Sequence, residues 1–313
     1  MKVLITESEN FSSKAIAHLK NYFQVELATI NDREELKLKI ADFDVIFIRL
    51  GYKMDREIIQ KAKKLKYILT ATTGLDHIDV AYFESIGGKV ISLKGETEFL
   101  ETIPSTAEHT WALLLSLLKK IPSSFHHVKD GEWDRNLFIN TNLKDKKIGI
   151  LGLGRVGKQV AKYAVAFNME IGFFDTTPIK SEFKKFETPK ELFQWADILS
   201  IHIPYSIENK NFVNRELLSH TKNQSFIINT SRGGVWDEKE IATLIEKGKL
   251  KGAATDVLEN ELNVNSISSN KLVLLAQQNF NVIITPHIAG ATKESMVMTE
   301  EFIVDKFLKL FRF

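Results

Sequence analysis

The chain has 313 residues, of which 44% are hydrophobic and 26% are charged. These fractions are typical of globular proteins and exclude a disordered or collagen-like chain. The formal net charge of only +2 gives no reason to expect a nucleic acid or a membrane surface as partner. Because there is no cysteine, disulfides, thiolate metal sites and cysteine nucleophiles are excluded.

The first hundred residues predict an α/β domain with a mostly parallel sheet, because short β-rich runs alternate with stretches of helical spacing. The expected strands are 3–6, 45–49, 67–71 and 89–93, and the expected helices are 12–22, 32–40, 55–62 and 79–86. The chain begins as a buried strand and not as a signal peptide, which indicates a cytoplasmic protein.

A long apolar helix is expected at 106–121, and a second alternation of strands and helices begins at Lys147. Its expected strands are 148–151, 171–174, 198–203, 226–229, 253–256 and 282–285, and an amphipathic helix is expected at 292–311. The longest apolar run, 111–118, is too short to span a bilayer. The sequence therefore predicts two α/β units joined by a helix.

The segment KIGILGLGRVG at 147–157 has the GxGxxG spacing of a dinucleotide-binding turn. It lies directly after an expected strand and opens an expected helix, whose N-terminal N–H groups favour bound phosphate. The first glycine permits the tight turn, the second lets the backbone approach a pyrophosphate, and the third lets the helix pack closely. Taken alone, the motif has a plain glycine-rich turn as its alternative. The expected cofactor-binding residues are Gly152, Gly154, Arg155, Val156 and Gly157.

Asp175 ends the next expected strand, 18 residues after Gly157, where an acidic side chain meets the adenosine ribose. Its carboxylate would accept hydrogen bonds from both ribose hydroxyls and repel a 2′-phosphate. No arginine follows it, and Lys180 is expected to be a solvated loop residue. We therefore predict NAD as the cofactor and not NADP.

Three downstream segments resemble the D-isomer-specific 2-hydroxyacid dehydrogenase family: IINTSRGGVWDE at 227–238, GAATDVLENE at 252–261 and ITPHIAGAT at 284–292. TTGLDHID at 72–79 and TAEHTWALLLSLLKKIP at 106–122 resemble further family segments in the expected order. The resemblance therefore covers nearly the whole chain.

The resemblance implies an α/β fold of two doubly wound parallel-sheet domains, with the active site in the cleft. Residues 1–101 and 288–313 would form a flavodoxin-like substrate domain, and 102–287 a Rossmann-like NAD-binding domain inserted in it. The implied activity is the NAD-dependent interconversion of a small D-2-hydroxy acid and its 2-oxo acid. A homodimer is also implied, for which the apolar helix at 111–118 is one candidate surface, although it could equally be core.

By this resemblance Arg232 binds the substrate, Glu261 is the partner carboxylate and His287 is the acid/base. The reaction needs these residue types. A planar guanidinium can grip the carboxylate and ketone oxygens of a 2-oxo acid, and an imidazolium can supply a proton to the C2 oxygen. Taken singly, the three residues could be a surface arginine, a loop acid and a domain-boundary histidine. Their joint placement after successive strands favours a site.

Five further residues are assigned by position and by the resemblance. Thr230 and Asp256 are expected near the cofactor, with a helix N-cap as the alternative for Asp256. The backbone N–H groups of Gly74 and Leu75 are expected to bind the substrate carboxylate. Arg49 is expected to touch the distal end of the substrate, with a surface salt bridge as the alternative.

The histidines outside this set have no expected chemical role. His109 is expected to pack within the connecting helix, and no partner gives a role to His77, His126, His127 or His202. No group of histidines and acids has metal-ligand spacing, so no metal is expected.

The chain also departs from the family pattern. Leu262 stands where a proline is usual, and 263–281 is longer and more polar than usual, so we expect a mobile loop around Glu261. Tyr205 replaces a small apolar residue, and lysines at 119 and 120 replace an arginine.

The R group of the substrate cannot be read from spacing. The competing interpretation of the whole chain is an NAD-responsive binding protein of the same fold with incidental turnover. Retention of the Arg, Glu and His favours the enzyme, and the Glu/His pair disfavours a formate-type dehydrogenase. No appended regulatory domain is expected.

Overall fold

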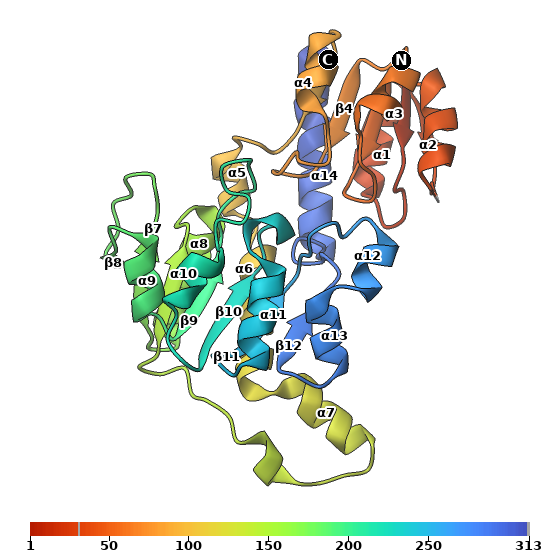
Figure 1. Ribbon diagram of the computed structural model, residues 1–313. Helices are drawn as coiled ribbons and strands as arrows, with labels where there is room; N and C mark the ends of the chain where they lie inside the picture. The colour runs from red at the N-terminus through yellow and green to blue at the C-terminus, as the bar shows by residue number, and fades with distance from the viewer. Residues whose placement is uncertain (31, 312–313) are drawn as a thin grey trace. The chain divides into compact units, whose positions relative to one another are not determined.

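The computed structural model describes residues 1–30 and 32–311, which form two compact units (Figure 1). The first unit comprises Met1–Ile103 and Ala291–Phe313, and the second comprises Pro104–Gly290. The boundaries predicted from the sequence, 101/102 and 287/288, lie within a few residues of these limits.

The first unit contains a five-stranded parallel sheet in the order β2-β1-β3-β4-β5, the flavodoxin-like doubly wound order. Its strands are β1 (Lys2–Ile5), β2 (Gln24–Leu27), β3 (Val45–Ile48), β4 (Tyr67–Thr70) and β5 (Lys89–Ile91). The edge strand β2 was not among the predicted strands. Three of its four residues are exposed, so it lacks the apolar run that marks the central strands.

Helices cover both faces of this sheet. On one face lie α1 (Ser13–Lys20) and α14 (Lys293–Leu308), and on the other lie α2 (Arg33–Lys39), α3 (Arg56–Lys61) and α4 (Val80–Ser85). The side chains of Ser12, Asp32, Asp55 and Asp79 cap α1, α2, α3 and α4. These caps are local sequence signals, which is why the starts of these helices could be predicted.

The second unit contains a seven-stranded parallel sheet in the order β12-β11-β10-β9-β6-β7-β8. Its strands are β6 (Lys147–Leu151), β7 (Glu170–Phe174), β8 (Lys184–Lys185), β9 (Ile198–Ile201), β10 (Ser225–Asn229), β11 (Leu250–Thr255) and β12 (Val282–Ile284). The strand order reverses at β6, since β7 and β8 lie on one side of it and β9 to β12 on the other. In such sheets ligands bind at the carboxyl ends of the strands, at this switch point.

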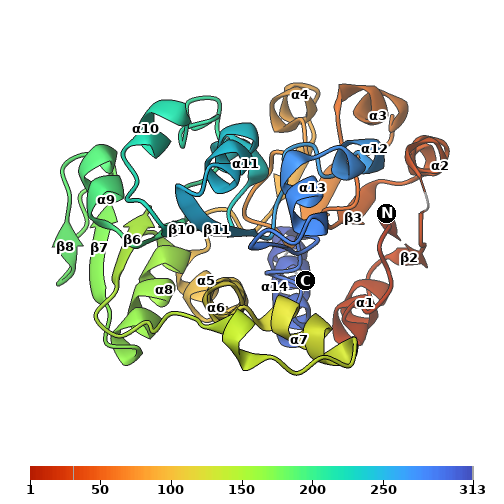
Figure 2. The same cartoon turned by 60° about the horizontal axis from the view of Figure 1, so that its bottom comes forward.

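Figure 2 shows helices on both sides of this second sheet. On one side lie α6 (Ser105–Lys119) and α8 (Arg155–Ala166), and on the other lie α9 (Pro189–Trp195), α10 (Arg215–Ser219), α11 (Glu238–Glu246) and α13 (Lys271–Gln277). The apolar run 111–118 lies within α6, and most of its residues are buried in the core of the unit. This run is therefore core, and it is not the surface through which a second copy would bind.

Three of the helices that were not predicted are α7 (Ile121–Lys129), α12 (Val264–Ser268) and α13. Lys120 adopts a left-handed φ of 55° and ends α6, and Pro122 lies in the first turn of α7, so the apolar stretch breaks into two helices. Within 263–281, the stretch that is longer and more polar than usual, the chain forms α12 and α13.

Candidate active site

The glycine-rich turn between β6 and α8 has the geometry that a dinucleotide requires. Gly152 has a φ of +92°, and a Cβ on it would lie 2.9 Å from the His202 carbonyl oxygen. A Cβ on Gly157 would lie 2.2 Å from the Gly152 carbonyl oxygen, so the helix packs against the turn more closely than any side chain allows. The space around Gly154, the N-cap of α8, is open within 4 Å. The turn thus leaves the helix N-terminus accessible to phosphate.

Asp175, directly after β7, lies beside this turn. One carboxylate oxygen accepts a hydrogen bond from the Leu153 N–H at 2.8 Å, and the other accepts one from the Thr177 N–H at 2.8 Å. These two bonds fix the carboxylate next to the glycines, and each oxygen keeps a second lone pair for a ribose hydroxyl. The residues present therefore fit a dinucleotide without a 2′-phosphate.

Arg232, Glu261 and His287 follow the carboxyl ends of β10, β11 and β12, three neighbouring strands. A parallel sheet brings such residues to one edge, although they are separated by up to 55 positions in the sequence. The edge is the one that carries the glycine-rich turn.

Glu261 and His287 form a pair, since a Glu261 carboxylate oxygen contacts His287 Nδ1. The second Glu261 oxygen accepts a hydrogen bond from the Leu258 N–H at 3.1 Å, which holds the carboxylate in place. Both side chains remain partly exposed, 21% for His287 and 30% for Glu261. Leu262, although it replaces the usual proline, leaves this contact intact.

The backbone at His287 is held in an unusual conformation. Its φ of 54° lies in the left-handed region, which is rare for a residue with a side chain and costs free energy. The His287 N–H donates to the Asp256 carbonyl oxygen at 2.8 Å. The fold therefore fixes the imidazole through the strand end of β11 as well as through Glu261.

Asp256 organises the loop that carries His287. Its side chain is fully buried, and its carboxylate accepts hydrogen bonds from the N–H groups of Ile288 at 2.9 Å and Ala289 at 2.7 Å, and from the Thr285 hydroxyl. It does not cap a helix, which was the alternative from the sequence. A contact between Asp256 and the cofactor stays a prediction.

His109 is the residue whose position the sequence analysis missed. From α6, its Nε2 lies 2.9 Å from the Thr285 hydroxyl and 3.3 Å from an Asp256 carboxylate oxygen. It therefore belongs to the same polar network as the loop of His287, and it does more than pack in the helix. No local signal could have revealed this, because Thr285 lies 176 positions away along the chain.

Arg232 lies in a braced turn after β10. The Asn229 side chain donates to the Arg232 carbonyl oxygen at 2.9 Å and accepts from the Ser231 N–H at 3.0 Å. A Cβ on Gly233 would lie 2.1 Å from the backbone of Leu258, so this turn packs directly on the segment that leads to Glu261. The arginine and the glutamate thus come from two turns in contact.

Two other residues that the sequence analysis singled out, Thr230 and Tyr205, lie near this turn. The Thr230 hydroxyl lies 2.7 Å from the Thr110 hydroxyl, and Thr230 is buried. Tyr205, the departure from the family pattern, packs its ring over Gly234, where a Cβ would lie 2.6 Å from the ring. Tyr205 therefore borders the Arg232 turn.

The remaining predicted substrate ligands lie in the first unit. Gly74 and Leu75 follow β4, and the Thr72 hydroxyl donates to the Gly74 carbonyl oxygen at 2.9 Å. Within the described residues, neither the Gly74 N–H nor the Leu75 N–H donates to a protein acceptor. Both N–H groups are therefore available to an anionic ligand.

Arg49 has protein partners for its guanidinium. Its Nε and one terminal nitrogen donate hydrogen bonds to the Glu300 carboxylate, at 3.0 and 2.5 Å. The other terminal nitrogen donates to the Glu9 carbonyl oxygen at 3.0 Å. Glu300 is 1% exposed, so this is a largely buried ion pair. The geometry favours the salt-bridge alternative for Arg49, and a substrate contact stays a prediction.

The other histidines lie outside this network. Desolvation lowers the pKa of His202 to about 3, and its Nε2 lies 2.7 Å from the Ser200 hydroxyl, so it is a neutral partner of the strand end of β9. Among the described residues, no group of three or more His, Asp or Glu side chains could hold a metal ion. In that part of the chain, no helix is both long and apolar enough to cross a membrane.

Comparison with known proteins decides the family. Residues 111–289 match the family model described as D-isomer specific 2-hydroxyacid dehydrogenase, NAD binding domain. The chain belongs to this family. The hydroxypyruvate reductase of Thermotoga maritima is 32% identical over 89% of this chain and 88% of its own length. NAD is the cofactor of this family's domain, in agreement with the glycine turn and Asp175.

Other family members differ in length or in substrate. The D-3-phosphoglycerate dehydrogenase of Methanocaldococcus jannaschii is 34% identical over the whole chain, but this chain covers only 58% of it. The chain thus spans little more than half the length of such relatives. The crystal structure of an Aquifex aeolicus D-lactate dehydrogenase, complexed with NAD and lactic acid, has a TM-score of 0.81 and 28% identity. It covers 99% of this chain and 95% of its own.

Proposed function

We propose that this chain is an NAD-dependent dehydrogenase that interconverts a small D-2-hydroxy acid and its 2-oxo acid. The contact between Glu261 and His287 Nδ1 is the observation that carries the proposal. A carboxylate on one ring nitrogen leaves Nε2 as the acid/base atom, and exchange of the proton on a C2 hydroxyl needs such an atom. Bound NAD supplies the acceptor and donor of the hydride at C2.

The remaining residues divide the work of binding and proton transfer. Arg232 is the candidate to hold the substrate carboxylate and the C2 oxygen with its planar fork. In the reduction direction His287, as imidazolium, gives a proton from Nε2 to the C2 oxygen as negative charge develops there. Glu261 stabilises the imidazolium. Gly74 and Leu75 are the proposed N–H donors to the substrate carboxylate.

His109 and Asp256 are proposed as positioning residues. Asp256 accepts from the backbone of Ile288 and Ala289, and His109 lies against the same carboxylate. Together they hold the left-handed turn at His287, which fixes the direction of the imidazole. Asp256 is also proposed to border the nicotinamide, and Thr230 the cofactor.

The substrate is proposed to be a three-carbon acid, because relatives are named for hydroxypyruvate, phosphoglycerate and lactate. The test is a spectrophotometric panel of hydroxypyruvate, pyruvate, glyoxylate and 3-phosphohydroxypyruvate with NADH, read at the nicotinamide absorbance. We expect kcat/KM of at least about 10⁴ M⁻¹s⁻¹ for one of the three-carbon acids, the lower end for enzymes on their substrates, and a lower value for the two-carbon glyoxylate. Absence of turnover with all four would contradict the proposal.

An NAD-responsive binding protein is the second candidate function, because the same fold binds the cofactor whether or not it turns over. It predicts tight NADH binding, a ligand-dependent change in assembly, and no oxidation of NADH with any acid of the panel. Binding and turnover measured on one sample separate the two functions.

We propose that the chain forms a homodimer through α7 and the segment that follows it. Figure 1 shows this segment projecting from its own unit. No residue of α7 is buried, and the segment exposes Ile121, Phe125, Val128, Trp133, Leu137 and Ile139. Apolar side chains gathered in this way mark a surface for another protein, and a second copy supplies an equal apolar surface.

A further inference from the structure

A pocket lies at the edge of the seven-stranded sheet opposite the candidate active site. It has a volume of about 260 Å³ and is lined from the amino ends of four strands. Lys146 precedes β6, Asp197 precedes β9, Lys222 lies just before β10, and Lys251 is the second residue of β11. Arg232, Glu261 and His287 lie beyond the carboxyl ends of strands of the same sheet, so this pocket is separate from them.

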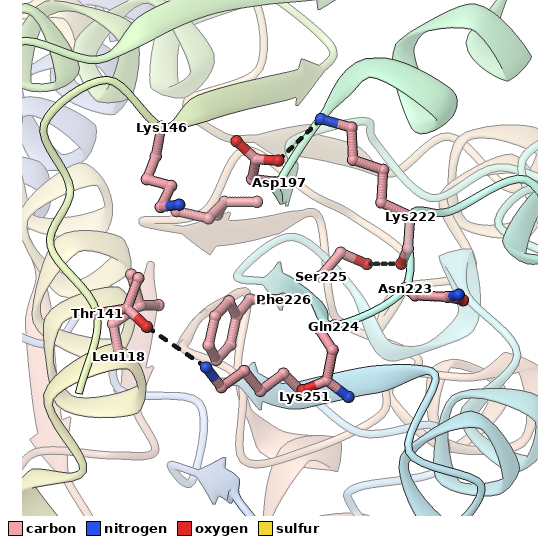
Figure 3. A pocket seen from close by; sticks show the side chains of 11 residues that line it. Leu118, Thr141, Lys146, Asp197, Lys222, Asn223, Gln224, Ser225, Phe226 and Lys251 are labelled. Carbon is pink, nitrogen blue, oxygen red and sulfur yellow. Dashed lines mark hydrogen bonds and ion pairs between the residues drawn. The ribbon is translucent and has the colours of Figure 1, made fainter. Parts of the chain in front are cut away.

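The charges in this pocket do not balance. Lysines outnumber carboxylates there by three to one. Figure 3 shows Lys222 bonded to Asp197, and Lys222 Nζ lies 2.8 Å from an Asp197 carboxylate oxygen. Burial would raise the pKa of Asp197, but Lys222, the Lys147 N–H and the nearby Lys146 lower it, so the carboxylate stays ionised. Asp197 and Lys222 therefore neutralise each other.

Lys146 and Lys251 are left without a carboxylate partner among the described residues. The ammonium of Lys251 reaches toward the Thr141 hydroxyl at 3.5 Å and lies 5.7 Å from the centre of the Phe226 ring (Figure 3). Lys119, from the end of α6, donates to the Thr141 carbonyl oxygen at 2.9 Å and adds a further positive charge nearby. The pocket thus carries a surplus of about two positive charges.

The walls of the pocket are not uniformly polar. Leu118, Ile198 and Phe226 supply an apolar side. Pockets for drug-sized molecules run from about 300 to 1,000 Å³, so a volume near 260 Å³ suits a smaller ligand. Two ammoniums beside an apolar wall are complementary to a doubly charged anion with a short carbon chain. Lysine is a common point-charge partner of phosphate.

We propose that this pocket binds a small phosphomonoester through Lys146 and Lys251. The phosphate dianion lies between the two ammoniums, and the carbon chain lies against Phe226. The alternative explanation is that these lysines merely complement the C-terminal ends of the helices that reach this edge, as lysines often do. That explanation predicts no saturable binding.

The test is calorimetric titration of the full chain with ethyl phosphate at fixed ionic strength, with saturating NADH to occupy the phosphate site at the glycine turn. Lys146→Met and Lys251→Met should each weaken binding at least tenfold, about 1.4 kcal/mol. Lys144→Met, an exposed neighbour that does not line the pocket, is the matched control and should change affinity less than twofold. If a methionine variant unfolds, the glutamine variant takes its place.

The pH dependence identifies the ligand chemistry. A phosphomonoester loses its second charge below a pKa near 6, so binding should weaken several-fold between pH 7.5 and pH 5. Succinate, a dicarboxylate, should bind at least tenfold more weakly than ethyl phosphate at pH 7.5. Equal affinity for succinate, undiminished binding in both lysine variants, or no saturable heat up to about 10 mM would each overturn the proposal. None of these results depends on dehydrogenase turnover.

Discussion

At the residue scale, the pair of Glu261 and His287 joins the fold to the proposed chemistry. Asp256, buried and bonded to the backbone of the loop, sets where the imidazole lies. In the proposed mechanism, Glu261 supplies a negative charge beside Nδ1 of the ring. The two acids therefore do different work, one geometric and one electrostatic.

Glu261→Gln keeps the shape of the side chain and removes its charge, so the imidazolium loses its stabilising partner. The alkaline limb of 2-oxo acid reduction, which needs the protonated ring, should move to lower pH. Oxidation of the hydroxy acid, which needs the neutral ring, should become active at lower pH. Both shifts are read from pH profiles of kcat/KM.

His287→Ala should lower turnover by roughly 10²- to 10⁴-fold in both directions, the usual effect of losing a positioned acid/base. Glu259→Gln serves as the control for a nearby acid. If Glu261→Gln leaves both profiles unmoved and Glu259→Gln shifts them, the partner of His287 has been misassigned.

Arg232→Lys keeps the positive charge but loses the planar fork, so kcat/KM for the 2-oxo acid should fall roughly 10²-fold or more. NADH affinity, measured by fluorescence titration, should stay within about twofold because the change does not touch the glycine turn. Arg215→Lys, on the exposed side of α10, is the matched control. Wild-type kinetics for Arg232→Lys would remove this residue from the substrate site.

Arg49→Met tests whether the ion pair with Glu300 is structural. Burial raises the pKa of Glu300, and the Ser12 N–H and Arg49 oppose that effect. Without Arg49 an ionised Glu300 would be buried without its cation, so unfolding free energy should fall by about 3 to 5 kcal/mol at pH 8. At pH 5 the carboxyl can take up a proton in the folded state, and the loss should be smaller.

Urea unfolding at the two pH values measures this difference. Arg33→Met is the control, because Arg33 forms more exposed ion pairs with Asp55 and Glu57. This substitution should lower the free energy of unfolding by less than about 1 kcal/mol. If Arg49→Met leaves stability unchanged but raises KM for the acid substrate, Arg49 acts on the substrate and the ion pair is incidental.

At the scale of elements, the turn between β6 and α8 and the end of β7 are joined into the proposed cofactor-binding unit. The Leu153 N–H, inside the glycine turn, donates to Asp175 at the end of the neighbouring strand. The acid is thereby fixed relative to the helix N-terminus. Cofactor preference is consequently a property of two adjacent strand ends and not of a single residue.

NADH should be preferred over NADPH by at least tenfold in kcat/KM, a difference of about 1.4 kcal/mol. Asp175→Ser should lower this ratio of kcat/KM values, mainly by weakening the binding of NADH. Lys180→Ser, in the exposed loop beyond, should leave the ratio unchanged. Equal use of both cofactors by the wild-type chain would show that the Asp175 carboxylate does not contact the ribose.

At the scale of the whole molecule, the exposed apolar side chains of α7 and the segment after it have no partner within the core clusters of either unit. The side chain of Trp133 is the largest of them and is 86% exposed. Its burial against a second copy would remove a large apolar area from water.

Light scattering at micromolar concentration should therefore give about twice the chain mass of 35.7 kDa. The double variant Phe125→Ser, Trp133→Ser should shift this equilibrium toward the monomer. Ile207→Ser, an equally exposed apolar residue in another loop, should not. A monomeric wild-type chain would exclude the homodimer.

Features that depend only on neighbouring residues could be predicted from local sequence signals. The glycine spacing at 152–157, the side-chain caps of the helices and the apolar runs of the central strands are local, so the α/β alternation and the cofactor turn were predictable. The roles of Arg232, Glu261 and His287 were expected from the resemblance to the family, and the position of each residue after a strand supported that expectation.

Only the tertiary structure decided which distant residues meet. His109 reaches Thr285 and Asp256, Arg49 meets a buried Glu300 that is 251 positions away, and the apolar face of α6 is core. The basic pocket exists because strands far apart in the chain begin at one edge of the sheet. Local spacing cannot specify such contacts, since they depend on how strands are ordered and on which helix covers which face.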